Sequence, residues 1–178
     1  MMKNVKLIVL DVDGTLTDGT ITYADDGTQT KSFHVADGLG IVMAHAVGLR
    51  IAVISGRASK AVEQRMTELK VTDLVQNCGD KAFALRLLLA KYELSSDEAA
   101  FVGDDINDLP AFAVAGVKIA VANASETLKA RADWVTPRPG GAGAVRDAIE
   151  EILRRQGRLD DAIAAYLNTA GHLGAARQ

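Results

Sequence analysis

The chain has 178 residues, of which 48% are hydrophobic and 24% charged, a balance that favours one packed domain and excludes intrinsic disorder. Its net charge of -3, with lysines and arginines scattered along the chain, excludes the basic face of a nucleic-acid-binding protein. A single cysteine, Cys78, excludes an internal disulfide and fits a reducing cytoplasm.

The first apolar run, Leu7 to Leu10, is short and is followed at once by Asp11 and Asp13. A signal peptide needs an apolar stretch of about 7–15 residues, and a membrane-spanning helix needs about 18. We therefore expect a soluble cytoplasmic protein with no membrane partner, in which Cys78 is an unreactive thiol.

Short apolar, β-branched runs alternate with segments of helical periodicity along most of the chain. The expected strands are Val5–Leu10, Ile51–Ile54, Leu74–Val75, Ala99–Val102 and Val117–Val121. The expected helices are Gly38–Val47, Lys60–Leu69, Lys81–Tyr92, Leu109–Ala115, Ala142–Arg155 and a short one over Leu159–Leu167. This alternation predicts an α/β fold, a three-layer Rossmann-like parallel sheet between helices.

One segment breaks this alternation. Thr20–Phe33 favours two strands around the turn Asp25-Asp26-Gly27, which predicts a β-hairpin flap over about residues 18–33. An isolated hairpin is marginal in water, so it needs a surface to pack on, and a neighbouring subunit is one solution. We expect a single domain over residues 1–167 and a flexible tail over residues 168–178, which are rich in small and polar residues.

Polar residues follow four of the expected strands. These residues are Asp11 and Asp13 after the first strand, Ser55 after the second, and Asp104, Asp105 and Asp108 after the fourth, while Lys81 opens the helix that follows the third strand. Asp and Gly are also common in ordinary turns. However, the carboxyl ends of parallel strands share one edge of the sheet, where ligands bind. Their placement therefore indicates a functional site.

The acidic groups predict a metal site and a reaction. So many carboxylates cannot share a small region without a cation, and oxygen ligands favour Mg²⁺. The ion, Lys81 and the Ser55 hydroxyl can together hold a phosphate. A carboxylate can then attack phosphorus and form an aspartyl-phosphate. Asp13 would protonate the leaving oxygen and later deprotonate the attacking water.

The runs DVDGT, VISGR and GDDIND, together with Lys81, resemble the four motifs of the haloacid dehalogenase superfamily of phosphohydrolases. The resemblance implies that Asp11 is the nucleophile and Asp13 the acid/base. It implies a magnesium site made by Asp11, the backbone carbonyl of Asp13, and Asp104. It further implies that Ser55, Gly56 and Lys81 bind phosphate, and that Asp105 and Asp108 support the site from outside the ligand set.

The segments LTDGTITY, HVADGLGI, VISGRASKAVEQR and PGGAGAVRDAIEEILRRQGRLD resemble one branch, the 3-deoxy-D-manno-octulosonate 8-phosphate phosphatases. The resemblance implies a β-hairpin in place of a cap domain, and a homotetramer in which a neighbouring subunit closes each site. It also implies a sugar phosphate substrate with a distant carboxylate. Candidate substrate-binding residues are Arg57, Arg65, Asp37 and Gly38, although both arginines are also compatible with solvated helix charges.

Two other functions stay open. Phosphatases of 2-keto-3-deoxynononate 9-phosphate are similar but carry Glu and Lys where this chain has Arg57 and Glu68, so the octulosonate is favoured. Asn77 stands where the branch usually has Gly, but Asn tolerates a left-handed backbone, so the loop can be kept. The third hypothesis is a non-catalytic tetramer that binds an acidic sugar. Asp11 and Asp13 argue against it, because binding alone needs no acid/base beside the nucleophile.

Overall fold

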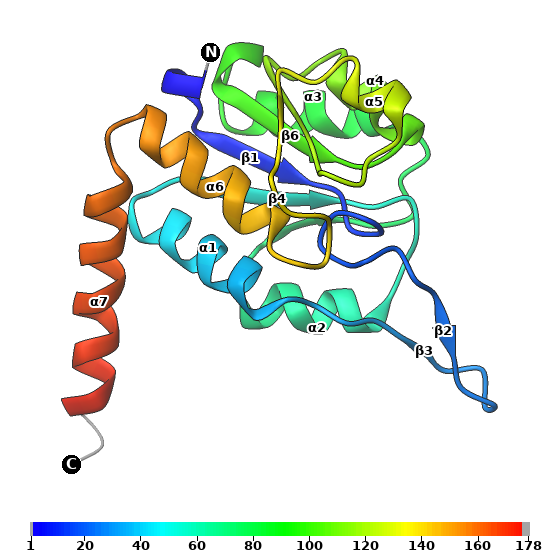
Figure 1. The fold of residues 1–178 in the computed structure, drawn as a ribbon, viewed down its shortest axis with the longest axis horizontal. Helices are drawn as coiled ribbons and strands as arrows, with labels where there is room; N and C mark the ends of the chain where they lie inside the picture. Colours follow the sequence, from blue (N-terminus) through cyan, green and yellow to red (C-terminus); the bar gives the residue numbers. More distant parts are fainter. Residues whose placement is uncertain (1, 176–178) are drawn as a thin grey trace.

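The structure, a computed structural model, describes the backbone of residues 2–175 and the side chains up to residue 168. A six-stranded sheet has the order β5-β4-β1-β6-β7-β8, and every neighbouring pair of its strands is parallel (Figure 1). Its strands are β1 Leu7–Leu10, β4 Arg50–Ile54, β5 Asp73–Val75, β6 Ala99–Gly103, β7 Val117–Ala120 and β8 Trp134–Val135. The predicted parallel α/β fold is confirmed.

Helices cover both faces of this sheet, with α1, α2 and α6 on one side and α3, α4 and α5 on the other (Figure 1). Their bounds are α1 Val35–Ala46, α2 Lys60–Glu68, α3 Lys81–Lys91, α4 Leu109–Phe112, α5 Glu126–Lys129, α6 Ala144–Arg155 and α7 Leu159–Ala175. Short 3-10 turns precede β1, β6 and α4. No helix in the described part is long and apolar enough to cross a bilayer.

Two short elements, β8 and α5, were not predicted, because two to four residues give no measurable periodicity. Conversely, α7 continues eight residues beyond the predicted end at Leu167, and reaches Ala175. Residues 169–175 include two glycines, which lower helix propensity and weaken the signal in the sequence. Residues 176–178 of the expected tail lie outside the described part of the chain.

Strand β1 is the centre of the core. All four of its residues are buried, because helices cover both faces of a parallel sheet. The apolar stripe of α6, with Val145, Ile149, Ile152 and Leu153 buried, packs on α1 and belongs to the same core cluster as the strands. Burial of this contiguous core is the main favourable term in the stability of the domain.

The predicted hairpin is present as a separate antiparallel sheet of β2 (Thr22–Tyr23) and β3 (Gln29–Thr30). Gly27 takes a φ of +81° in its turn, a conformation that favours glycine. The hairpin projects away from the main sheet (Figure 1), and Tyr23 exposes 62% of its surface. Within one chain the hairpin therefore has little to pack on.

A glycine-rich loop before α6 lies against the loop that follows β1. A Cβ on Gly140 would stand 1.7 Å from the carbonyl oxygen of Gly14, so this approach requires glycine. The N–H of Gly141 donates to the carbonyl of Thr15 at 3.1 Å. The loop after β1 is thus held in place from the carboxyl-terminal part of the same chain.

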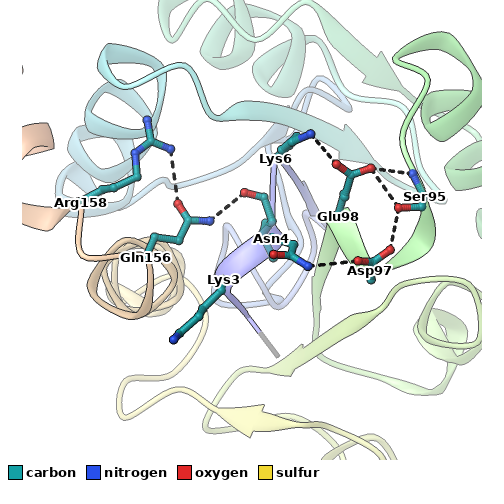
Figure 2. Close-up of a pocket in the computed structure, with 9 residues that line it drawn as sticks. Lys3, Asn4, Lys6, Ser95, Asp97, Glu98, Gln156 and Arg158 are labelled. Atoms are coloured by element: carbon teal, nitrogen blue, oxygen red, sulfur yellow. Dashed lines mark hydrogen bonds and ion pairs between the residues drawn. The ribbon is translucent and has the colours of Figure 1, made fainter.

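A polar cavity of about 570 Å³ lies at the opposite, amino-terminal ends of the strands (Figure 2). Polar side chains in its lining contact one another: Lys6 forms an ion pair with Glu98 at 2.5 Å, and the Asn4 amide donates a hydrogen bond to Asp97 at 3.3 Å. Gln156 donates to the carbonyl of Val5 at 2.8 Å. These contacts join the amino-terminal segment to β6 and the end of α6, so we assign the cavity a structural role.

Candidate active site

Residues of the candidate site follow three adjacent strands of the sheet. Central β1 pairs with β4 on one side and with β6 on the other. After β1 the chain adds strands on the β4 side and then returns to add β6 on the other side, so the order of the strands reverses at β1. Asp11, Ser55 and Asp104 are the residues that directly follow these three strands. The N–H of Asp11 donates to the carbonyl of Val102 at 3.0 Å, which fixes the start of the loop. A ligand site is expected at such a reversal.

Three carboxylates meet at this edge. Oxygen atoms of Asp11, Asp104 and Asp108 lie within 4.8 Å of one another. Nζ of Lys81 is 2.6 Å from Oδ1 of Asp11 and 2.6 Å from Oδ1 of Asp108. The remaining oxygen of Asp108 accepts the N–H of Asp104 at 3.0 Å. Asp108 thereby holds both the lysine and the loop that carries Asp104.

Lys81 reaches the cluster because it is the first residue of α3. Asp80 caps this helix by accepting the N–H of Phe83 at 2.9 Å, so the helix starts at a defined residue. The Lys81 side chain is only 4% exposed, and its charge is matched by buried carboxylates. Although burial favours the neutral amine, Asp11 and Asp108 raise the pKa of Lys81, which therefore stays protonated.

The carboxylates repel one another. Burial, together with the charge of Asp108, raises the pKa of Asp11 to about 6, even though Lys81 opposes the shift. Burial and the charges of Asp11, Asp108 and Asp105 raise the pKa of Asp104 to about 8. The single positive charge of Lys81 does not compensate the negative charges of these carboxylates, so the cluster favours binding of a further cation.

The cluster fits a hard divalent cation. All of its donors are oxygen atoms, which Mg²⁺ prefers, and a cation would relieve the repulsion that raises the two pKa values. Gly14, at a φ of +98°, gives the cluster room, since a Cβ there would lie 2.0 Å from Oδ2 of Asp104. Among the described residues, the carboxylates of Asp13 and Asp105 lie outside this group of three.

The loop after β4 has a buried serine and an open glycine. The Ser55 hydroxyl accepts the N–H of Arg57 at 3.2 Å, and the backbone carbonyl of Ser55 accepts the N–H of Cys78 at 3.0 Å. Next to Cys78, Asn77 has a φ of +52°, a left-handed conformation that Asn tolerates. A Cβ on Gly56 would have one neighbour within 4 Å, at 3.8 Å, so space is free beside it.

The Asp13 carboxylate, outside the group of three, forms an ion pair with Lys31. No pattern in the sequence pointed to this lysine, because a charged residue beside an exposed hairpin strand is typical of a solvated surface. Its side chain is nevertheless 1% exposed. Asp105 also has a local role, since its carboxylate accepts the N–H of Ile106 at 2.7 Å and caps the 3-10 turn Ile106–Asp108.

The two candidate arginines occupy different places. Arg57 is exposed beside the site, with its guanidinium 3.5 Å from the hydroxyl of Tyr23 on the hairpin. Arg65 lies on α2, against Gly38 of α1, and pairs with Glu68 at 3.2 Å. Arg57 therefore faces the hairpin, whereas Arg65 fills the contact between α1 and α2.

Asp37 is buried, with 1% of its surface exposed. One carboxylate oxygen accepts the N–H of Arg146 at 2.8 Å, in the first turn of α6, where a negative charge is favoured. Burial raises the pKa of this carboxyl. The structure therefore gives Asp37 a visible role in joining α1 to α6.

Comparisons with known proteins agree with this geometry. Residues 70–149 match the family model of haloacid dehalogenase-like hydrolases. The 3-deoxy-D-manno-octulosonate 8-phosphate phosphatase of Escherichia coli K12 is 42% identical over 90% of this chain and 85% of its own length.

Solved structures are similarly close. The octulosonate phosphatase of Moraxella catarrhalis, in complex with magnesium, phosphate and the sugar acid, has a TM-score of 0.89 and 41% identity, over 93% of this chain and 95% of that one. The cobalt-bound phosphatase of Haemophilus influenzae has a TM-score of 0.88 and 38% identity, over 93% and 98%. This chain therefore belongs to the haloacid dehalogenase superfamily, in the family of the 3-deoxy-D-manno-octulosonate 8-phosphate phosphatases.

Proposed function

We propose that this chain is a magnesium-dependent phosphatase that hydrolyses 3-deoxy-D-manno-octulosonate 8-phosphate to the free sugar acid and phosphate. The observation that carries the proposal is the cluster of Asp11, Asp104 and Asp108 around Lys81 at the reversal of strand order. Relatives with this fold and about 40% identity are named for this substrate, and one binds magnesium, phosphate and the sugar acid together.

The metal would be held by the carboxylates of Asp11 and Asp104 and by the backbone carbonyl of Asp13. When bound, it supplies positive charge that neutralises phosphate oxygens. The Asp13 carboxylate is not needed for this, which agrees with its side chain lying outside the cluster. Asp108, fully buried, would keep Lys81 and the Asp104 loop in place rather than bind the ion.

The chain's own residues divide the reaction between them. Ser55, Gly56 and Lys81 bind the phosphoryl oxygens. A carboxylate oxygen of Asp11 attacks phosphorus while Asp13 gives its proton to the leaving sugar oxygen, which leaves an aspartyl-phosphate. Asp13 then takes a proton from water, whose oxygen attacks phosphorus and releases Asp11. Lys81, already hydrogen-bonded to Asp11, orients the nucleophile.

The far end of the substrate would meet Arg57. It is exposed beside the site, and a guanidinium can donate two hydrogen bonds to a carboxylate. Arg65 and Gly38 pack on each other, so we assign them to shaping the region behind α1 rather than to direct contact. Asp105 supports the site through the charge that it adds near Asp104.

The substrate assignment is tested with a panel of sugar phosphates in the presence of Mg²⁺. We expect the highest kcat/KM for the octulosonate 8-phosphate, ahead of the nonulosonate 9-phosphate and of sugar phosphates without an α-keto acid. Arg57→Ala should lower kcat/KM for the keto acids by about 10-fold or more, because one charge-assisted pair is lost. A preference for phosphates without a keto acid would contradict the substrate assignment, while the assignment of phosphatase activity would stand.

The nucleophile is tested in the same assay. Asp11→Asn should abolish phosphate release while leaving the fold intact, as measured by circular dichroism. A non-catalytic sugar-binding protein would instead show no turnover in the wild type either. Unchanged turnover in Asp11→Asn would remove the covalent mechanism.

Metal removal should make stability depend on pH. Because the pKa values of Asp11 and Asp104 are raised, the folded metal-free protein binds more protons than the unfolded chain between about pH 4 and 8. Its free energy of unfolding should therefore fall as pH rises through this window. Mg²⁺ should restore stability more at pH 8 than at pH 5, because it binds deprotonated carboxylates. Urea unfolding with and without Mg²⁺ measures both.

Asp104→Asn isolates the cause of this effect. Without metal, the variant should be more stable than wild type at pH 8, by about 1 kcal/mol or more, because one repelling charge is gone. It should gain little from Mg²⁺. Asp161→Asn, at an exposed position, should behave as wild type. Equal stability of the metal-free wild type at pH 5 and 8 would contradict the repulsion.

We also infer that the chain forms a homotetramer in which a neighbouring subunit covers the site. The exposed hairpin, with Ile21 and Tyr23 open to solvent, supports this, since two strands alone are marginal in water. Light scattering should give a mass of about four times 18.8 kDa. Replacing both residues by Ser should yield smaller species with a raised KM. An active wild-type monomer would contradict the assembly.

A further inference from the structure

Lys31 is the first residue after the hairpin strand β3, and its ammonium group contacts Oδ1 of Asp13. Hairpin residues are mostly exposed, yet the Lys31 side chain is 1% exposed and that of Asp13 is 22% exposed. A lysine that only solubilised the hairpin would extend into water. Its stem is instead covered, and its charge lies on one carboxylate.

Both arms of the hairpin are fastened to the loop that follows β1. In the first arm, the Thr17 hydroxyl accepts the N–H groups of Gly14 at 3.3 Å and Gly19 at 3.2 Å. In the second arm, Lys31 holds Asp13, and Phe33 packs on the core two residues later. The orientation of Asp13 is therefore set by the returning arm of the hairpin.

The ion pair of Lys31 separates it from the phosphate-binding lysine. Lys81 lies between Asp11 and Asp108, inside the cluster. In the described part of the chain, Lys31 forms its ion pair with Asp13, which lies outside the cluster. The two lysines therefore contact two carboxylates with different proposed roles. Lys81 contacts the proposed nucleophile, Asp11, and Lys31 contacts the proposed acid/base, Asp13.

We propose that Lys31 is a positioning residue that holds the Asp13 carboxyl group against the leaving oxygen, and so links the hairpin to proton transfer. This inference rests on the proposed phosphatase function. In the first step the P–O bond to the sugar breaks, the bond from Asp11 to phosphorus forms, and the Asp13 proton moves to the sugar oxygen. Lys31 keeps its own protons and fixes the carboxylate that remains until water returns a proton to it.

The test compares two leaving groups. A sugar alkoxide needs a proton to leave, whereas p-nitrophenolate leaves without one. Lys31→Met should lower kcat for the sugar phosphate by about 10- to 100-fold, and kcat for p-nitrophenyl phosphate by less than about 3-fold. Asp13→Asn gives the reference pattern for a missing acid. Lys31→Arg, which keeps the charge, should recover part of the lost kcat for the sugar phosphate.

Lys91→Met is the matched control, because Lys91 also pairs with one aspartate, Asp73 at 2.5 Å, but lies on α3 away from the hairpin. It should leave both rates unchanged. Equal losses of Lys31→Met on both substrates, or no loss on either, would overturn the inference while the phosphatase function stands if wild type and Asp13→Asn behave as expected. An inactive wild type would refute the proposed function itself.

Discussion

The site depends on the repulsion between carboxylates that the fold forces together. Asp11, Asp104 and Asp108 come from loops after two neighbouring strands, and burial leaves them little water to screen their charges. Lys81 matches part of the charge, and the remainder creates the demand for a hard cation. The same uncompensated charge that destabilises the metal-free cluster is what would make it bind a cation and then a phosphate.

Backbone features make this gathering possible. Gly14 lets the loop after β1 pass beside Asp104, and Gly140 lets the loop before α6 press on that same loop. Asp37 joins α1 to the first turn of α6, which holds this second loop in turn. The nucleophile loop is therefore held directly by β6 and by the loop before α6. This keeps the charged groups of the site in fixed positions, as a preorganised site requires.

The sequence was enough to predict the longer strands and helices and the sheet edge that carries Asp11, Ser55 and Asp104, because buried parallel strands have a strong local pattern and their carboxyl ends share one edge. The shortest elements, β8 and α5, were missed. The sequence did not predict Lys31, since the contact with Asp13 spans the whole hairpin and leaves no periodic signal. It also did not predict the contact of Asp37 with the first turn of α6, because only the packing of α1 on α6 brings these residues together.

The most direct test is a crystal structure with Mg²⁺ and a phosphate mimic. The account predicts one ion between Asp11 and Asp104, at about 2.0–2.1 Å from a carboxylate oxygen of each, with the mimic next to the ion and within hydrogen-bond distance of Ser55 and Lys81. An ion bound elsewhere, or a mimic held without any ion between these two carboxylates, would contradict it.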